Sequence, residues 1–204
     1  MESIYKELIK TIGKDRVLIN EPMSKHTSFR IGGPADLFIK VNDVDELNCV
    51  LKVAKKNNIA VTCIGNGSNT LVKDKGIRGI TIKLNFTDIN VNGDIIEVGS
   101  GVAIPVLAKV AYDNSLTGLE FASGIPGTVG GAIAMNAGAY DGEFGNIVVS
   151  TKYMDENLEV HTITKEEQEF SYRHSFFSTG KNIIISTIIK LEKGNKEEIK
   201  EKMQ

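Results

Sequence analysis

Apolar residues recur along this chain with two periods, and their order predicts a mixed α+β protein. Apolar positions three or four apart are typical of amphipathic helices, and short apolar runs bounded by Gly, Asn and Asp are typical of strands. The expected helices cover residues 3–12, 43–57, 104–111, a short segment after 164, and 195–204. The expected strands cover residues 37–41, 60–64, 79–84, 89–98 as a hairpin across Asn92-Gly93, 148–154, 159–164 and 183–191.

The expected strand at 37–41, the helix at 43–57 and the strand at 60–64 follow one another in the order β–α–β. Asp43 and Glu46 have capping-box spacing at the helix start, and the returning strand, expected to be buried, leads into a glycine-containing loop. A dinucleotide fingerprint needs a third glycine where Thr70 stands, and no Lys-Ser or Lys-Thr pair of a P-loop follows. The remaining interpretations are an ordinary structural turn or a phosphate-binding turn made by Gly65, Asn66, Gly67, Ser68 and Asn69.

A third of the chain's twenty glycines crowd into residues 122–145. Glycine loses more backbone entropy on folding than other residues, so such a cluster indicates unusual backbone conformations or close approach of a ligand. We expect a flat or anionic ligand here, with a tight turn before a closely packed strand as the alternative. Valine at Gly130 or Gly131 should then abolish ligand binding and leave the fold largely intact. The glycines are Gly124, Gly127, Gly130, Gly131, Gly138, Gly142 and Gly145.

A second candidate site lies in residues 170–177, where four aromatic residues surround Arg173 in sequence. The functional interpretation is that aromatic walls exclude water and strengthen the attraction of Arg173 for a substrate anion. The alternatives are an arginine stacked on tyrosine and an arginine paired with an internal carboxylate.

Composition narrows the class of function. The chain is 41% hydrophobic and 25% charged with a net charge of −2, which is ordinary for a globular protein and argues against nucleic-acid and membrane-surface partners. Cys49 and Cys63 lack metal-ligand spacing, so we expect buried thiols in a reducing, cytoplasmic compartment. The N-terminal residues contain neither a signal peptide nor a membrane span.

Metal chemistry is not expected. The three histidines, His26, His161 and His174, lie far apart in sequence and have no ligand spacing. The acidic residues around position 155 (Asp155, Glu156 and Glu159) are interpreted as a solvated surface.

Four blocks in order resemble one family, the UDP-N-acetylenolpyruvoylglucosamine reductases, also called UDP-N-acetylmuramate dehydrogenases. The resemblance covers nearly the whole chain. The blocks are Thr27–Gly33, Ile64–Asn69, Gly124–Ala132 continued by Asn136–Tyr140, and the segment Tyr172-Arg173-x-Ser175-x-Phe177.

This resemblance implies a flavoenzyme of bacterial peptidoglycan synthesis with a PCMH/vanillyl-alcohol-oxidase-type FAD-binding fold of two α+β subdomains, not a Rossmann sheet. NADPH would reduce a non-covalent FAD held between the subdomains, and hydride would pass to the enolpyruvyl group of a UDP-sugar. Arg173 would be catalytic, and Tyr172 and Arg173 would bind substrate. The FAD-binding residues implied are Gly65, Asn66, Gly67, Ser68, Asn69, Gly124, Ile125, Pro126, Gly127, Thr128, Gly130, Gly131, Ala132, Asn136 and Gly138.

The expected domains are residues 1–84 and 85–195, the two FAD-binding subdomains, with residues 196–204 starting a C-terminal substrate-binding domain that is missing. The family's serine proton donor and C-terminal glutamate would lie in that domain, so we expect a truncated chain that does not complete turnover. Ser175 is not expected to replace the donor, and Asp141 stands where the family more often has glycine.

Two other functions stay open at this point. One is a flavin-binding module without catalysis, for which an arginine among aromatic residues would have no use. The other is a different FAD oxidoreductase of the same fold, acting on a sugar or an alcohol, in which His or Cys often tethers the flavin. His26 is the only histidine before both glycine loops, and nothing in the sequence indicates such a tether.

Overall fold

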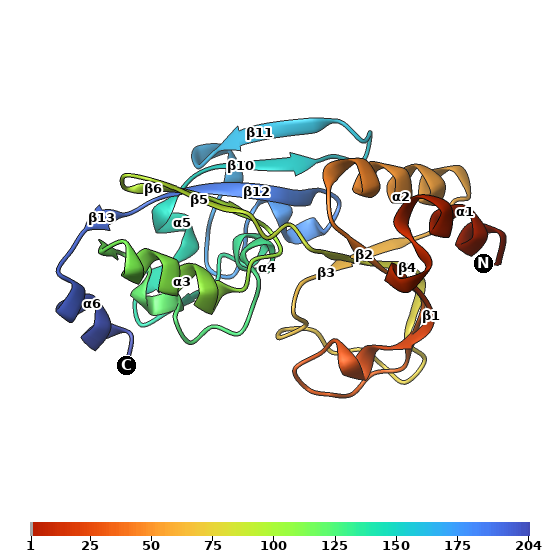
Figure 1. Cartoon of the computed structure of the whole chain (residues 1–204), viewed down its shortest axis with the longest axis horizontal. Helices are drawn as coiled ribbons and strands as arrows, with labels where there is room; N and C mark the ends of the chain where they lie inside the picture. The colour runs from red at the N-terminus through yellow and green to blue at the C-terminus, as the bar shows by residue number, and fades with distance from the viewer. Residues whose placement is uncertain (1) are drawn as a thin grey trace. The chain divides into compact units, whose positions relative to one another are not determined.

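The computed structural model describes residues 2–204, and the chain divides into two compact units. Unit 1 ends at Phe86 and unit 2 begins at Thr87. Each unit has its own sheet and its own helices, and the colour ramp of Figure 1 follows them from red to blue.

Unit 1 contains a four-stranded mixed sheet in the order β1-β2-β4-β3 (Figure 1). β2 and β3 each run parallel to β4, whereas β1 pairs antiparallel with β2 at one edge. The helix between β2 and β3 gives the expected β–α–β arrangement. The elements are α1 (Glu2–Ile12), η1 (Lys14–Arg16), β1 (Val17–Pro22), η2 (Met23–Lys25), β2 (Pro34–Val41), α2 (Val44–Lys56), β3 (Val61–Ile64) and β4 (Ile77–Leu84).

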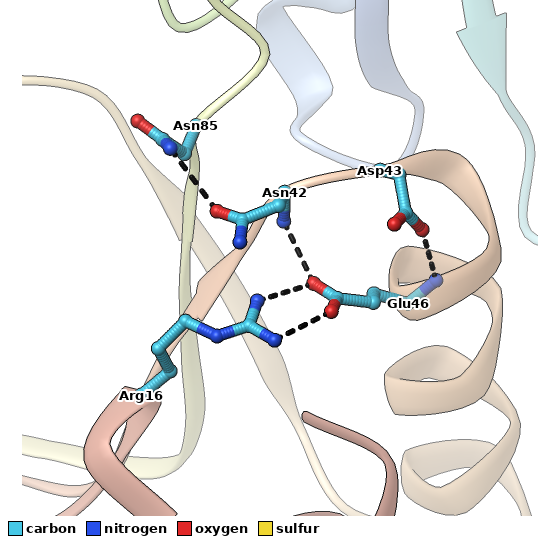
Figure 2. A network of polar contacts seen from close by, with 5 residues as sticks. All are labelled: Arg16, Asn42, Asp43, Glu46 and Asn85. Carbon is cyan, nitrogen blue, oxygen red and sulfur yellow. Dashed lines mark hydrogen bonds and ion pairs between the residues drawn. The ribbon is translucent and has the colours of Figure 1, made fainter. Parts of the chain in front are cut away.

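A polar network fixes the start of α2 (Figure 2). The Asp43 carboxylate accepts a hydrogen bond from the Glu46 amide at 2.8 Å, as the capping spacing predicts. The Glu46 side chain accepts from the amide of Asn42, one residue earlier than a standard capping box, at 2.8 Å. Arg16 binds the same carboxylate through two nitrogens at 2.6 and 2.7 Å, and the Asn85 amide donates to the Asn42 side chain at 3.0 Å.

The pKa values of this pair follow from the geometry. The hydrogen bonds from Arg16 lower the pKa of Glu46 and outweigh the opposing effect of its burial. The guanidinium in turn has its pKa raised, mainly by the hydrogen bond to Glu46. The network therefore joins η1, the start of α2 and the segment after β4.

The burial expected for the strand at 60–64 is wrong. β3 lies at the edge of the sheet, and only Ile64 among its four residues is buried. Cys63 is exposed and Cys49 is half-buried, so the prediction of two buried thiols is wrong as well. Apolar runs alone do not distinguish a central strand from an edge strand, because the difference depends on pairing far along the chain.

Unit 2 contains a five-stranded antiparallel sheet in the order β11-β10-β12-β6-β5. The long elements are β5 (Ile89–Asn92), β6 (Ile95–Gly99), α3 (Ile104–Asp113), β10 (Val148–Met154), β11 (Val160–Thr164) and β12 (Ile183–Lys190). The short ones are β7 (Leu116–Thr117), η3 (Glu120–Ala122), α4 (Val129–Ala134), β8 (Gly138–Ala139), β9 (Gly142–Glu143), α5 (Phe144–Ile147), η4 (Glu166–Gln168), η5 (Phe176–Thr179), β13 (Glu192–Lys193) and α6 (Lys196–Lys202).

The helices of unit 2 bury the faces that the sequence predicts. Ile104, Leu107, Ala108 and Ala111 of α3 all lie in the core, and Pro105 stands in its first turn. α4 packs on β12 and β6 within the same core (Figure 1). Asn195 caps α6, and Ile199 of that helix is buried. The hairpin of β5 with β6 and the pairing of β10 with β11 are confirmed, but the two turn residues are Gly93 and Asp94, one position later than predicted, because Asn92 pairs with Ile95.

Candidate cofactor and substrate site

The loop after β3 is joined to the segment between η2 and β2. The amide of Ser28 donates to the carbonyl of Gly67 at 3.2 Å, and Gly67 has a φ of +63°. A Cβ at Gly67 would collide with the carbonyl oxygen of His26. Local packing therefore explains this glycine, and two of the four sequence blocks form one joined surface in unit 1.

The rest of the loop offers polar groups next to a lysine that the sequence analysis did not single out. Asn69 is exposed, and Gly65, Asn66 and Ser68 are half-buried. Lys83 of β4 donates to the Asn66 side chain at 3.4 Å, and its cross-strand neighbour is Lys40. Burial, and then the charge of Lys40, lower the pKa of Lys83. A charged residue inside the apolar run of β4 was the signal that could have identified it.

The glycine core forms a turn and the short helix α4, not the turn and strand of the alternative interpretation. Thr128 caps α4 by accepting from the Gly131 amide at 3.4 Å, and the Gly130 amide donates to the Ser100 carbonyl at 2.8 Å. A Cβ at Gly130 would lie 2.9 Å from the Ser100 Cβ. The expectation that valine at Gly130 leaves the fold largely intact is therefore wrong, because α4 packs directly on Ser100 and a larger side chain must displace it.

Two other glycines of the core have no such structural explanation. A Cβ at Gly124 would meet no atom within 4 Å, and one at Gly131 would meet only the Thr128 hydroxyl at 3.5 Å. Both residues are exposed, as is Pro126 between them in sequence. The fold leaves open space where these side chains would stand, so this edge fits a ligand that approaches the backbone closely.

The other predicted residues of the glycine core are less exposed than Gly124, Pro126 and Gly131. Thr128 and Ala132 are buried, and Ile125 and Gly127 are half-buried. The Ser100 hydroxyl beside Gly130 is buried and has no hydrogen-bond partner among the described residues. The core therefore presents backbone and small residues to its surroundings, which suits the flat ring or the anionic oxygens of FAD.

Arg173 stands in a tight turn between Ser171 and His174. These two residues exchange backbone hydrogen bonds of 3.1 Å, and Arg173 has a φ of +54°. Its Nη2 donates to the carbonyl of Gly138 at 3.2 Å, and its guanidinium lies 5.7 Å from the centre of the Tyr172 ring. Both side chains line an open hollow of about 340 Å³ together with Asn136 and Gly138.

The structure corrects the expectation of aromatic walls around Arg173. Arg173 is exposed, and Tyr172 is 87% exposed. Phe176 and Phe177 instead pack edge-on against Tyr153 of β10, with ring centres 5.6 and 5.4 Å away. Only Tyr172 contacts the guanidinium among the described aromatic rings, as in the tyrosine-stacking alternative.

Ser175 is fully buried, and its hydroxyl forms hydrogen bonds with backbone groups. Its hydroxyl donates to the carbonyl of Ala134 at 3.0 Å and accepts from the Phe177 amide at 3.2 Å. The Ser178 hydroxyl donates to the same carbonyl at 2.9 Å. These bonds attach the arginine segment to the end of α4 and leave Ser175 with a structural role.

Two of the three histidines are engaged within the protein. The ring of His26 stacks on Phe38 at 4.0 Å, and its Nε2 lies 3.1 Å from the Glu21 carboxylate. His161 contacts Asp155 at 3.2 Å, and these two with Glu159 bring one ligand atom each to within 4.8 Å of one another. Asp155 also accepts the Asn157 and Glu159 amides, and the Glu159 bond is the main cause of its lowered pKa. The sequence spacing did not predict this proximity.

Comparisons with known proteins define first the class and then the family. A domain family described as FAD binding domain matches residues 35–164. UDP-N-acetylenolpyruvoylglucosamine reductase of Clostridioides difficile is 44% identical over 204 residues, which is 99% of this chain and 67% of that protein. UDP-N-acetylenolpyruvoylglucosamine reductase 2 of Bacillus anthracis is 45% identical, over 100% of this chain and 67% of that protein.

Solved structures agree with this assignment. UDP-N-acetylenolpyruvylglucosamine reductase (MurB) from Thermus caldophilus has a TM-score of 0.78 at 32% identity, over 92% of this chain and 65% of that chain. Phl p 4.0202, a glucose dehydrogenase, has a TM-score of 0.75 at 16% identity, over 95% of this chain and 44% of that chain, and shows the shared fold alone.

The chain thus has the PCMH-type fold of FAD-binding proteins, as the resemblance implied. It belongs to the UDP-N-acetylenolpyruvoylglucosamine reductase family and spans about two thirds of the length of the curated relatives it matches. Among the described residues, no helix has both the length and the apolar character needed to cross a membrane.

Proposed function

We propose that this chain carries the FAD-binding part of an enzyme that reduces UDP-N-acetylenolpyruvoylglucosamine to UDP-N-acetylmuramate with NADPH. The observation that supports the proposal most is the open backbone edge at Gly124 and Gly131, which the fold itself does not require. Membership of the reductase family supplies the substrate and the reaction.

FAD would be held without a covalent bond. In unit 1, the loop Gly65–Asn69 offers backbone groups and side-chain donors, and the ammonium of Lys83 adds positive charge beside Asn66. In unit 2, the backbone from Gly124 to Ala132 would contact the cofactor directly. His26 is occupied by Glu21 and Phe38, which favours non-covalent binding.

When bound, FAD would accept hydride from NADPH and pass it to the enolpyruvyl double bond. The task of Arg173 would be to bind the substrate carboxylate and stabilise the negative charge that develops as hydride arrives. Its turn conformation and its bond to Gly138 keep the guanidinium at the mouth of the hollow, where the carboxylate could approach. Tyr172, exposed beside it, would flank the substrate.

No proton donor for the second carbon is proposed from this segment. Ser175, the serine nearest to Arg173 in the motif, is fully buried, and its hydroxyl donates to the carbonyl of Ala134. We expect the 204-residue chain to bind FAD and to accept hydride from NADPH.

The test begins with the visible absorption of the purified chain before and after acid precipitation. Flavin colour released into the supernatant supports non-covalent FAD, whereas colour retained in the pellet favours a covalently tethered flavin and another oxidoreductase of this fold. A chain that stays colourless after incubation with FAD contradicts the proposal.

A second measurement follows NADPH oxidation with and without UDP-N-acetylenolpyruvoylglucosamine. NADPH oxidation by residues 1–204 that depends on this UDP-sugar would support the proposed reaction. Flavin that is neither reduced by NADPH nor perturbed by the UDP-sugar would favour a binding module without catalysis.

A further inference from the structure

We propose that Asn136 is a positioning residue for Arg173, acting through a buried amide that holds the arginine turn in place. The inference rests on the proposed role of Arg173 and assigns the Asn136 side chain to positioning, because both ends of its amide are engaged with protein groups. The Asn136 side chain is therefore not available to FAD, and any contact with the cofactor would be made by the Asn136 main chain.

The amide of Asn136 connects two segments that meet at the end of α4. Its Nδ2 donates to the carbonyl of Ser171 at 3.0 Å, and its Oδ1 accepts from the amide of Gly145 at 2.8 Å. Asn136 is only 1% exposed. At Gly145 a Cβ would lie 2.9 Å from the Cβ of Phe170 and 3.1 Å from Oδ1 of Asn136, so a side chain at this position would press on both residues.

The arginine turn is attached to this segment at two points. Asn136 holds the Ser171 carbonyl at the start of the turn, and the Arg173 guanidinium bonds the Gly138 carbonyl two residues beyond Asn136. Ser171 and His174 close the turn between these points. A displacement of Ser171 would therefore shift the guanidinium relative to the hollow that Asn136 and Arg173 both line.

Asparagine meets three requirements of this position at once. The residue has a φ of +41°, a conformation in which Asn is favoured over most side chains. It needs one donor for Ser171 and one acceptor for Gly145, and an amide offers both. An ionised aspartate keeps the size and the acceptor but loses the donor, so Asn136→Asp breaks the bond to the arginine turn and also buries a charge.

The matched control is Gln168, another fully buried amide of unit 2. It donates to the carbonyl of Thr164 at 3.1 Å and accepts from the Thr151 hydroxyl at 2.8 Å. Gln168→Glu therefore makes the same chemical change at an amide that bonds to Thr164 and Thr151 and not to the arginine turn. A general loss of packing affects both variants, whereas misplacement of Arg173 affects only Asn136→Asp.

The first readout is limited trypsin cleavage after Arg173, measured against cleavage after the exposed Arg30 of unit 1 in the same sample. Opening of the turn exposes its peptide bonds, so Asn136→Asp should raise the ratio of the two cleavage rates about tenfold, and Gln168→Glu should leave it near the unsubstituted value. Equal ratios in the two variants would overturn the positioning role.

The second readout compares two ligands on the FAD-loaded chain. UDP-N-acetylenolpyruvoylglucosamine carries the carboxylate, and UDP-N-acetylglucosamine lacks it. Asn136→Asp should weaken binding of the first about tenfold and leave the second unchanged, while Gln168→Glu should change neither. Equal weakening of both ligands by Asn136→Asp would overturn the inference.

The two proposals can fail separately. If the unsubstituted chain binds both ligands equally or binds neither, the proposed role of Arg173 fails, and the cleavage ratio alone decides whether Asn136 holds the turn. If the unsubstituted chain binds the carboxylate-bearing ligand more tightly than the other ligand, and Asn136→Asp does not change this difference in affinity, the proposed role of Arg173 stands. The positioning inference is then wrong.

Discussion

The guanidinium of Arg173 and the carbonyl of Gly138 lie 3.2 Å apart, so the proposed carboxylate-binding group is held by the segment that continues the glycine core. Arg173 is otherwise exposed, and its only described aromatic contact is Tyr172. One N–H of Nη2 makes this bond, which leaves the second N–H of Nη2 and those of Nη1 for a two-point contact with a ligand.

Arg173→Lys should leave flavin content unchanged and weaken binding of the enolpyruvyl ligand by about tenfold or more, because an ammonium cannot offer a two-point fork. Titration of the FAD-loaded chain with that ligand, followed by flavin absorbance, measures the effect. Arg78→Lys, at an exposed arginine of β4 outside both candidate sites, serves as the control. Equal affinity in Arg173→Lys and the unsubstituted chain would remove Arg173 from substrate recognition.

Gly131→Val and Gly130→Val should have different effects, although the two residues are adjacent. Valine at Gly131 meets open space and should abolish FAD binding with a small change in stability. Valine at Gly130 must displace the Ser100 backbone, so unfolding should become easier by about 2–4 kcal/mol. Thermal unfolding and FAD titration of both variants separate the effects, and normal FAD affinity in Gly131→Val would exclude that edge as the site.

Lys83→Met should lower FAD affinity by about tenfold at low salt, because the substitution keeps the apolar stem and removes the positive charge beside Asn66. The difference should shrink as ionic strength rises. Lys52→Met, on the exposed side of α2, is the matched control and should bind FAD normally. An unchanged affinity in Lys83→Met would mean that the cofactor's phosphates lie elsewhere.

The ion pair of Arg16 and Glu46 should make unit 1 sensitive to acid. The pKa of Glu46 is lowered below its ordinary 4.5, so its contribution to stability is present above that pH and is lost as the pH falls through the lowered value. Glu46→Gln should cost about 1–2 kcal/mol at pH 7 and flatten the acid limb of the stability curve. Denaturant unfolding at several pH values checks this.

Glu2→Gln provides the comparison for that experiment. Glu2 pairs with Lys6 at 2.6 Å, but both side chains are exposed, so the substitution should leave the pH dependence as it is. Identical acid limbs in Glu46→Gln and the unsubstituted chain would contradict the assignment of acid sensitivity to Glu46.

Asp141→Gly should stabilise unit 2 by about 0.5 kcal/mol, the difference between relief of an unfavourable φ and the entropy cost of glycine. Tyr140 and Asp141 form the two-residue turn between β8 and β9 with φ values of +47° and +62°, where glycine is usual at the second position. The reverse change, Gly93→Asp in the turn between β5 and β6, should destabilise. A lower unfolding temperature for Asp141→Gly would contradict this interpretation.

The sequence predicts local structure best where chemical signals act within a few residues. Asp43 caps α2, and Asn195 caps α6, because each side chain reaches an amide two or three residues away. The hairpin of β5 with β6 and the buried stripe of α3 follow from similarly short-range patterns, although the turn lies one residue later than predicted.

Predictions that depended on distant partners were less successful. Phe176 and Phe177 contact Tyr153 on β10 instead of Arg173, and Gly130 packs on Ser100 at the end of β6. The exposure of Cys63 follows from the position of β3 at the sheet edge. Lys83 is recognised as a candidate cofactor-binding residue only in the structure, where β4 places it beside Asn66. No short window of sequence contains both members of these pairs.

The contact of Gly67 with the His26–Ser28 backbone has a consequence for protein engineering. Because the Gly67 position has no room for a side chain and its carbonyl binds Ser28, the loop at 65–69 and the segment at 27–33 act as one part made from two stretches of sequence. A chimera that takes one stretch from a relative and keeps the other would join surfaces not shaped for each other. Exchange of cofactor loops between members of the family should therefore move both stretches together.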